Sequence, residues 1–141
     1  MNKLGFYKLV KMIVLWYYLV GGFMNNLVLA YLGDAVYELY IREYLINNGY
    51  AKVNDLQNES LKYVTAKAQS DHLKRLTDNN ILTEEEIDIV KRGRNMSSHN
   101  KKNTDIVTYK RSTGLECLIG SLKIDNKTER INEIMSYIVG D

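Results

Sequence analysis

The spacing of apolar residues along the chain predicts helices throughout. From Leu27 to Asn47 they recur every three or four positions, and the run ends at an Asn-Asn-Gly sequence that is typical of a helix C-terminus. No alternation of apolar and polar residues bounded by hairpin turns is present in the sequence. The 141 residues also contain no proline, the strongest helix breaker. The sequence therefore predicts an all-α fold.

Further helices are expected after this first one. Asn54 or Asp55 has the residue type of an N-terminal cap, and Thr83 with Glu86 has the spacing of a capping box. Gly140 follows the final apolar run as a stop signal. The expected ranges are 54–77 with a break near residue 60, 83–94, 105–124 with a restart near residue 112 left open, and 127–139.

Length and composition describe one globular domain. A chain of 141 residues holds one core, and its 45% hydrophobic and 26% charged residues exclude an intrinsically disordered protein. The single cysteine, Cys117, excludes an intramolecular disulfide framework and a cysteine-rich zinc site. A reducing, cytoplasmic location is the corresponding expectation.

The N-terminal region differs from the rest. No residue from Met12 to Gly33 is charged, which raises the question of a membrane span, yet glycines and asparagines interrupt the stretch. A signal peptide would need a small-residue cleavage site, and none is present. Met24 begins a segment that reads as a natural start. We therefore expect residues 1–23 to be an extension or a loosely docked helix, residues 24–141 to be the functional domain, and no membrane partner.

Basic residues gather in one part of the chain. Residues 91–111 carry seven basic residues against Asp105 alone, a net +6, so the remainder of this +2 chain sums to −4. Such a segment suits a polyanionic partner such as nucleic acid, and it equally suits a solvated surface. Gly93 and the polar sequence NMSSHN indicate a loop within it. The basic residues are Lys91, Arg92, Arg94, Lys101, Lys102, Lys110 and Arg111.

Two carboxylates interrupt the apolar helix expected at 27–47. Glu38 has Arg42 four residues on as an ion-pair partner. Asp34 has Ala30 and Glu38 at the corresponding positions and needs a cation from elsewhere. Because the helix is otherwise apolar or aromatic nearly all round, we expect it to be central and mostly covered. Its apolar side comprises Leu32, Ala35, Val36, Leu39 and Ile46, and a tyrosine stripe suited to the core or to self-association comprises Tyr37, Tyr40 and Tyr44.

Glu116 is another carboxylate on an otherwise apolar segment, RSTGLECLIGSLKI. Gly120, one turn away, permits the close approach of another backbone or of a ligand. If Asp34 and Glu116 come together, they repel unless they share a proton or a divalent metal. Magnesium suits two hard oxygen ligands completed by water. The alternative, that each carboxylate simply caps or pairs, stays open on the residues alone.

These two segments resemble the motifs of a known family. LAYLGDAVYELYIREYL is similar to the signature segment of the ribonuclease III domain, and TGLECLIGSL resembles its second motif. The order and spacing of the motifs, in a resemblance that runs from Leu27 to Val139, look most like Mini-ribonuclease III. That is the short branch without a double-stranded-RNA-binding domain.

The resemblance implies an all-helical homodimer that cleaves double-stranded RNA, with one metal site per subunit. Asp34 and Glu116 match the catalytic aspartate and glutamate and would hold Mg2+, and cleavage would leave a 5′ phosphate and a 3′ hydroxyl. Longer ribonuclease III enzymes have two further acidic ligands, at positions that Ala30 and Thr113 occupy here. The short branch shares this difference.

The resemblance implies that side chains of the basic segment contact the phosphates of A-form RNA, which proteins recognise by its shape. Arg92, Arg94 and Asn95 in the sequence KRGRN are the first candidates, because Gly93 lets the chain bend between them. Lys91 opens the same sequence, and the second group is Lys101, Lys102, Lys110 and Arg111.

The implied substrate is precursor 23S ribosomal RNA, cut where its ends pair. A large-subunit ribosomal protein or the assembling subunit would help to present the stem. No histidine base is needed, so His72 is expected on a helix surface and His99 in a loop. A rival interpretation is a non-catalytic ribonuclease III-like module that binds RNA or the ribosome, which would not need Asp34 and Glu116 together.

Overall fold

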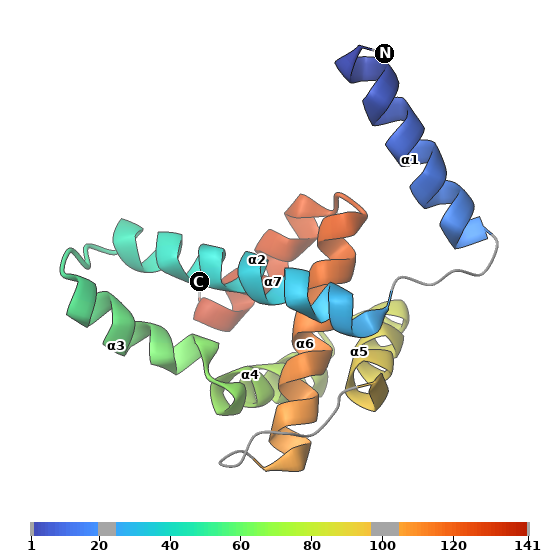
Figure 1. Cartoon of the computed structure of the whole chain (residues 1–141). Coiled ribbons are helices and arrows are strands. Elements are labelled where there is room, and N and C mark those ends of the chain that lie inside the picture. The colour runs from blue at the N-terminus through green and yellow to red at the C-terminus, as the bar shows by residue number, and fades with distance from the viewer. Residues whose placement is uncertain (1, 20–24, 97–104, 141) are drawn as a thin grey trace.

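The computed structural model describes residues 2–19, 25–96 and 105–140, and every regular element in these ranges is an α-helix (Figure 1). The all-α prediction is confirmed. The helices are α1 (Lys3–Leu19), α2 (Asn26–Asn47), α3 (Val53–Val64), α4 (Ala66–Asp78), α5 (Glu84–Met96), α6 (Ile106–Ile124) and α7 (Thr128–Val139).

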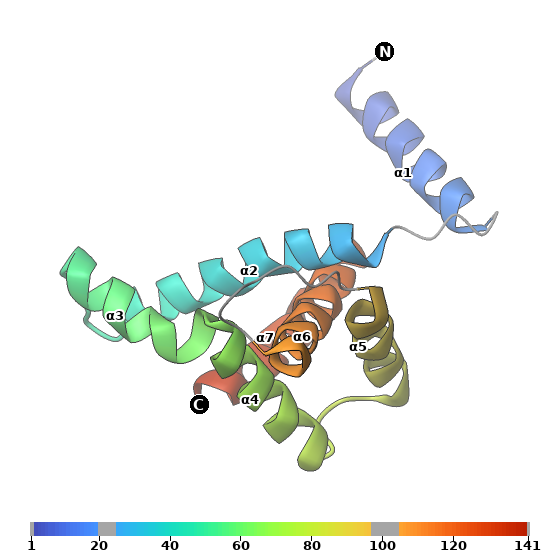
Figure 2. The ribbon, with the colours of Figure 1, turned by 60° about the horizontal axis from the view of Figure 1, so that its bottom comes forward.

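Helix α6 forms the centre of the fold. Helix α2 crosses it, α4 and α5 pack against its sides, and α7 follows it after a short turn at residues 125–127 (Figures 1 and 2). Helix α3 follows α2 as the second arm of a hairpin. The large apolar side chains that are fully buried come from α2, α4, α6 and α7. They are Tyr37, Ile41, Leu76, Leu115, Leu118, Ile119, Ile134 and Met135.

Most helix boundaries agree with the predicted ranges, and local hydrogen bonds explain them. Asp105 caps α6 by accepting two bonds from backbone N–H groups, at 3.0 and 3.3 Å, and α6 continues without interruption past Ser112. The predicted capping box is confirmed. The Glu86 carboxylate accepts from the N–H of Thr83 at 2.9 Å, and the Thr83 hydroxyl accepts from the N–H of Glu86 at 3.1 Å.

The break between α3 and α4 falls at Thr65, so the prediction of a break near Ser60 is wrong. Thr65 has extended backbone angles (φ −67°, ψ 152°), and its hydroxyl accepts a bond from the backbone N–H three residues on at 3.1 Å. This bond satisfies a donor of the first turn that has no partner inside α4. Helix α3 starts after Lys52, so Asn54 and Asp55 lie inside the helix and do not cap it.

Helix α2 is covered on one side only, which corrects the expectation of a mostly covered element. Leu39 and Ile46, on the side expected to be apolar, are each 57% exposed. Tyr37 is fully buried, as predicted for the core, and its hydroxyl donates to the carbonyl of Tyr63 at 2.8 Å. The buried residues form a row with a spacing close to four: Leu29, Ala30, Gly33, Tyr37, Ile41 and Leu45.

Helix α1 stands apart from the other helices (Figures 1 and 2). Its large apolar side chains from Leu4 to Trp16 are exposed. Within the residues described, no helix is long and apolar enough to cross a lipid bilayer. The N-terminal region is helical from Lys3 to Leu19. The division of the chain at residue 24 stays a prediction.

Two glycines let α2 and α6 touch backbone to backbone. A Cβ atom added to Gly33 would lie 1.7 Å from the carbonyl oxygen of Glu116, and one added to Gly120 would lie 1.8 Å from the carbonyl oxygen of Leu29. No side chain fits in either place, so only glycine allows the helices to cross at this separation. The contact sets the register between α2 and α6.

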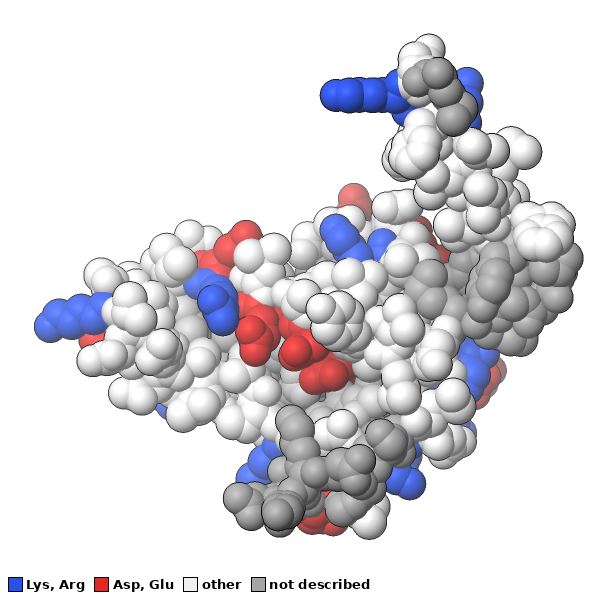
Figure 3. Space-filling model, viewed as in Figure 1, with Lys and Arg blue, Asp and Glu red and all other residues white. Residues whose placement is uncertain are grey.

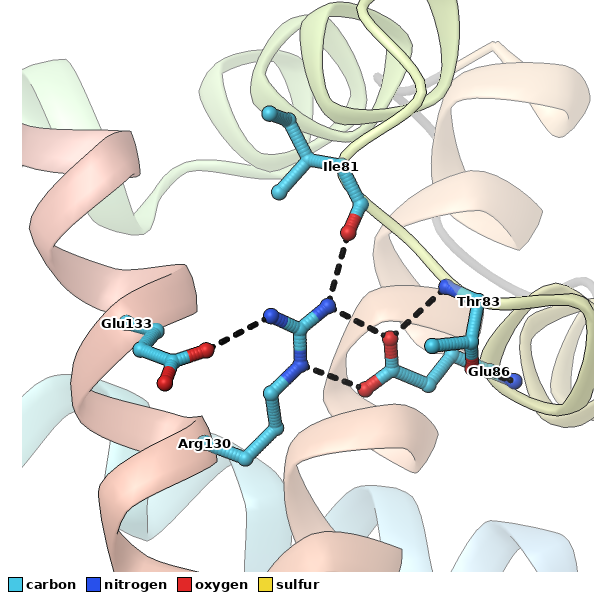
Figure 4. Close-up of polar contacts among 5 residues, drawn as sticks. All are labelled: Ile81, Thr83, Glu86, Arg130 and Glu133. Atoms are coloured by element: carbon cyan, nitrogen blue, oxygen red, sulfur yellow. Dashed lines mark hydrogen bonds and ion pairs between the residues drawn. The ribbon is translucent and has the colours of Figure 1, made fainter.

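A buried ion pair joins the start of α5 to α7 (Figure 4). The Arg130 guanidinium donates to both carboxylate oxygens of Glu86, at 2.9 and 2.7 Å, and to the carbonyl of Ile81 at 2.7 Å. Its remaining arm donates to Glu133 at 2.8 Å. Glu86 also accepts from Thr83, so this carboxylate is well satisfied although its side chain is only 7% exposed.

These bonds decide the charge state of Glu86. Burial by itself raises the pKa of this carboxyl, but the hydrogen bonds from Arg130 and Thr83 together outweigh burial and hold the pKa below its ordinary value. Glu86 therefore remains ionised at neutral pH, and the ion pair ties α5 to α7.

Replacement of Arg130 by alanine would leave the Glu86 carboxylate buried without its cation. We expect the free energy of unfolding, measured by urea denaturation, to fall by about 3 kcal/mol. Arg42→Ala is the control. The Arg42–Glu38 pair, at 3.3 Å, is exposed and should contribute less than ~1 kcal/mol. Equal losses in the two variants would contradict a structural role for the buried pair.

A methyl group at position 120 should force α2 and α6 apart. We expect Gly120→Ala to lower the free energy of unfolding by about 3 kcal/mol, because the added carbon meets a backbone oxygen that cannot move alone. Gly93→Ala is the graded comparison, because its added carbon would lie 2.7 Å from Cβ of Cys117 and 3.1 Å from Cα of Gly114, a smaller overlap than the 1.8 Å contact at position 120, and it should cost less. Thermal unfolding of both variants measures the difference. A Gly120 variant as stable as the Gly93 variant would show that the backbone contact does not limit the crossing.

Candidate active site

The crossing of α2 and α6 brings Asp34 and Glu116 to one place. Asp34 directly follows Gly33, the residue whose backbone rests on the Glu116 carbonyl. The Asp34 side chain is exposed, and Glu116 is half-buried. Figure 3 shows acidic side chains gathered in the middle of the face that carries α2. Two carboxylate residues far apart in the sequence are thus neighbours in the fold.

The negative charge of Glu116 affects Tyr37, a buried residue of α2. Burial raises the pKa of the Tyr37 phenol, and the negative charge of Glu116 raises it further. The Glu116 carboxylate therefore lies near a fully buried part of α2, where charges are screened less than in bulk water.

The oxygen donors at the crossing fit a magnesium-type cation. Magnesium binds through one or two carboxylates and keeps several of its waters. Among the residues that the structure describes, no three His, Cys, Asp or Glu side chains form a metal-binding group. Ala30 is buried, and the Thr113 hydroxyl donates to the carbonyl of Tyr109 at 3.1 Å. Neither position therefore adds negative charge to the crossing.

The structure separates the basic residues that were predicted to contact RNA. Lys91, Arg94 and Arg111 line one cleft of about 250 Å³ between α4, α5 and the start of α6. Arg92 does not line this cleft. It precedes Gly93, which packs on Cys117, and its charge lowers the pKa of that thiol, which burial raises to about 11. The other described members of the group are Asn95, which is exposed, and Lys110, which is half-buried.

His72, which lies in the described part of the chain, packs between α3 and α4 and not at the crossing of α2 and α6. His72 is half-buried, which corrects the expectation of a surface residue. Its ring stacks on Tyr63 with centroids 6.0 Å apart, and its Nε2 lies 3.1 Å from the carbonyl oxygen of Lys62. Burial is the main cause of its lowered pKa, so the ring is neutral at pH 7 and packs α3 against α4. The predicted residues Lys101, Lys102 and His99 lie outside the described residues.

Lys74 on α4 also lines the cleft and was absent from the predicted set. It lies well before the basic segment in the sequence and forms an ion pair with Asp78 one turn on, as many surface lysines do. No local signal distinguished it. Only the packing of α4 beside α5 and α6 brings it to the other basic side chains.

Comparison with known proteins gives the family. The Ribonuclease III domain matches residues 27–127. Mini-ribonuclease 3 of Streptococcus pneumoniae is 45% identical over 117 residues, which cover 82% of this chain and 91% of that protein. Mini-ribonuclease 3 of Staphylococcus aureus is 44% identical over 117 residues, which cover 82% and 87% respectively. A crystal structure of a Fusobacterium nucleatum protein matches with a TM-score of 0.74 and 34% identity, over 83% of this chain and 93% of that one.

Both carboxylate motifs fall inside the matched region. The similarity therefore includes the crossing of α2 and α6 as well as the surrounding core. With its helical fold, its two motifs and its relatives in agreement, the chain belongs to the ribonuclease III family, in the Mini-ribonuclease 3 branch.

Proposed function

We propose that the chain cleaves double-stranded RNA with Asp34 and Glu116 as its catalytic carboxylates and Mg2+ as its metal. A Mini-ribonuclease 3 is an endoribonuclease, so the proposal concerns the residues, the metal and the substrate. The observation that carries it is the contact of the Gly33 backbone with the Glu116 carbonyl, which places both carboxylates at one crossing.

The two carboxylates would act as ligands held by different helices. Asp34 belongs to α2 and Glu116 to α6, and the core fixes the register of these helices, so the helices would not need to rearrange for the pair to hold a hard cation. Bound Mg2+ would supply a Lewis acid for the phosphate and a water of lowered pKa. Hydrolysis joins the water oxygen to phosphorus and breaks the bond to the 3′ oxygen, which takes up a proton. The products carry a 5′ phosphate and a 3′ hydroxyl.

Basic side chains of α5, α6 and the segment between them are proposed to hold the RNA phosphates. Side chains contact A-form RNA through its phosphates and 2′ hydroxyls, because its deep groove hides the base edges. Contacts of this kind make binding weaken steeply with salt. The proposed RNA-binding residues are Arg92, Arg94, Asn95, Lys91, Lys101, Lys102, Lys110 and Arg111.

The proposed substrate is the stem formed by the paired ends of precursor 23S ribosomal RNA, which the enzyme would meet in the cytoplasm. A domain that binds by phosphate contacts gains from a large-subunit ribosomal protein, or the assembling subunit, that presents the stem. Cleavage of naked and protein-bound precursor at equal rates would contradict the need for such a partner.

A homodimer is proposed to complete the enzyme. Neighbouring parts of α2 and α3 expose large apolar side chains, and a groove of about 280 Å³ lies between the two helices. Exposed apolar side chains beside a groove, such as Ile46 and Val53 here, are typical of contact surfaces between proteins. A two-fold contact would give each dimer two carboxylate sites, one for each RNA strand. The exposed residues are Leu39, Ile46, Val53 and Leu61, at 55 to 67%.

Residues 24–141 are proposed as the catalytic domain, with residues 1–23 as an extension. The Ribonuclease III domain match begins at residue 27, and the described part of α1 contributes no side chain to the core.

Cleavage of a labelled RNA duplex tests the catalytic residues. Asp34→Asn and Glu116→Gln should each lower the Mg2+-dependent rate at least about a hundredfold, because each removes one of two charged ligands. Duplex binding, measured separately in EDTA, should persist. Glu43→Gln alters an exposed carboxylate elsewhere on α2 and should keep full activity. A chain that starts at Met24 should cleave like the full chain.

The assay also separates the enzyme from its rival function. If wild type binds precursor ribosomal RNA in the presence of Mg2+ and cuts nothing, the chain is a non-catalytic RNA-binding module. Full activity in the Asp34 or the Glu116 variant would remove that residue from the catalytic pair.

A charged residue on the apolar surface should disrupt the dimer. We expect Leu39→Lys to sediment as a monomer in analytical ultracentrifugation at concentrations where wild type is dimeric, because a buried lysine without a partner is unfavourable. Val107→Lys, at a 46% exposed position on α6, is the control and should leave the dimer intact. A wild-type chain that remains monomeric at micromolar concentration would contradict the dimer.

A further inference from the structure

A basic cleft lies on the opposite side of α6 from the two carboxylates. Arg111 and Glu116 are five positions apart, which separates them by about 140° around the helix axis. Gly120 faces α2, whereas Gly114 faces α5, where an added Cβ would lie 2.8 Å from the carbonyl oxygen of Val90. The cleft is therefore separate from the proposed catalytic crossing.

Four basic side chains from three helices converge on this cleft, with Asp78 as the single acidic residue of its lining. The floor is apolar, because Leu73, Leu82 and Val90 are buried beneath it. Converging cations above an apolar floor create a positive potential that water screens only in part. The basic residues are Lys74 of α4, Lys91 and Arg94 of α5, and Arg111 of α6.

Arg94 carries a buried donor that lacks a partner. Its Nε atom is buried and makes no hydrogen bond within the described part of the chain. The aliphatic part of the side chain packs on Gly114, where an added Cβ would lie 2.9 Å from Cγ of Arg94. This packing restrains the guanidinium at the cleft. Because the Nε is inaccessible, an anion in the cleft would be bound by the terminal nitrogens of this restrained guanidinium.

Acidic neighbours offset only part of the cleft's charge. Lys74 pairs with Asp78, and Asp71 and Asp105 lie close enough to Arg111 to feel its charge. The other three basic residues of the cleft form no ion pair with any residue that the structure describes. Positive charge is therefore left over for a ligand.

We propose that this cleft binds a phosphate group away from the scissile bond. Guanidinium groups match the oxygens of phosphate in geometry, and lysine ammonium groups add charge. The phosphate comes either from an RNA duplex that extends beyond the cut or from free inorganic phosphate. Phosphate binding rests on the geometry of the cleft alone, whereas RNA as its source rests also on the proposed function.

Inorganic phosphate is the first probe. Addition of phosphate to the full chain, at constant ionic strength, should shift the amide NMR signals of Lys74, Lys91 and Arg111. Lys74→Ala should weaken this binding roughly fivefold, the effect of about one lost charged contact. Lys62→Ala is the matched control, because Lys62 is also exposed and also pairs with an acidic neighbour on its own helix, but lies outside the cleft. It should leave phosphate binding unchanged.

Duplex RNA binding in EDTA, measured over a range of salt concentrations, identifies the source of the phosphate. If RNA fills the cleft, Lys74→Ala should lower the slope of log affinity against log salt by about 1, and Lys62→Ala should not change it. A lower slope supports the cleft as an RNA contact, with or without detectable binding of inorganic phosphate. Phosphate shifts with an unchanged slope support a site for free phosphate.

If inorganic phosphate causes no NMR shifts and Lys74→Ala leaves the salt slope unchanged, the proposal is overturned. That failure is distinct from failure of the proposed function, because Lys74 belongs to no part of the catalytic crossing. Cleavage at saturating duplex by wild type and by Asp34→Asn reports the carboxylates whatever the cleft binds.

Discussion

The backbone contact between α2 and α6 is the constraint on which the rest of the molecule depends. Gly33 and Gly120 leave no room for side chains between the helices, so their separation and register are fixed together. The buried row of α2, which includes Tyr37 and Ile41, then packs into the core. A rotation of α2 by one residue, about 100°, would turn Asp34 away from Glu116. The same contact therefore sets both the core and the meeting of the carboxylates.

Helix α6 separates two surfaces of opposite charge. A different interaction fixes the helices that form each surface. The glycine contact fixes the acidic side by backbone geometry. The basic side depends on α5, whose first turn is tied to α7 by the bidentate pair of Arg130 with Glu86. In the proposed function both surfaces act on one polyanion, and the central helix between them keeps their opposite charges from neutralising each other.

Local signals in the sequence predicted most of the fold and singled out the two carboxylates that the fold brings together. Caps such as Asp105 are readable because the residue and the donors it satisfies are adjacent. Asp34 and Glu116 became candidates because carboxylates are unusual in apolar runs. Which side of α2 is covered was not predictable, since an apolar pattern all round does not say where the neighbouring helix lies. Lys74 was missed for a similar reason, because only tertiary packing brings it to the basic segment.

The glycines of α6 weaken that helix when it stands alone. Gly114 and Gly120 each lower its intrinsic helix propensity by about 1 kcal/mol relative to alanine. The helix therefore depends on α2 and α5 packing against it, and its formation is cooperative with that of the core. The two carboxylates meet only once this cooperative step is complete. A partly folded chain thus carries the same charged residues but has no assembled pair of carboxylates.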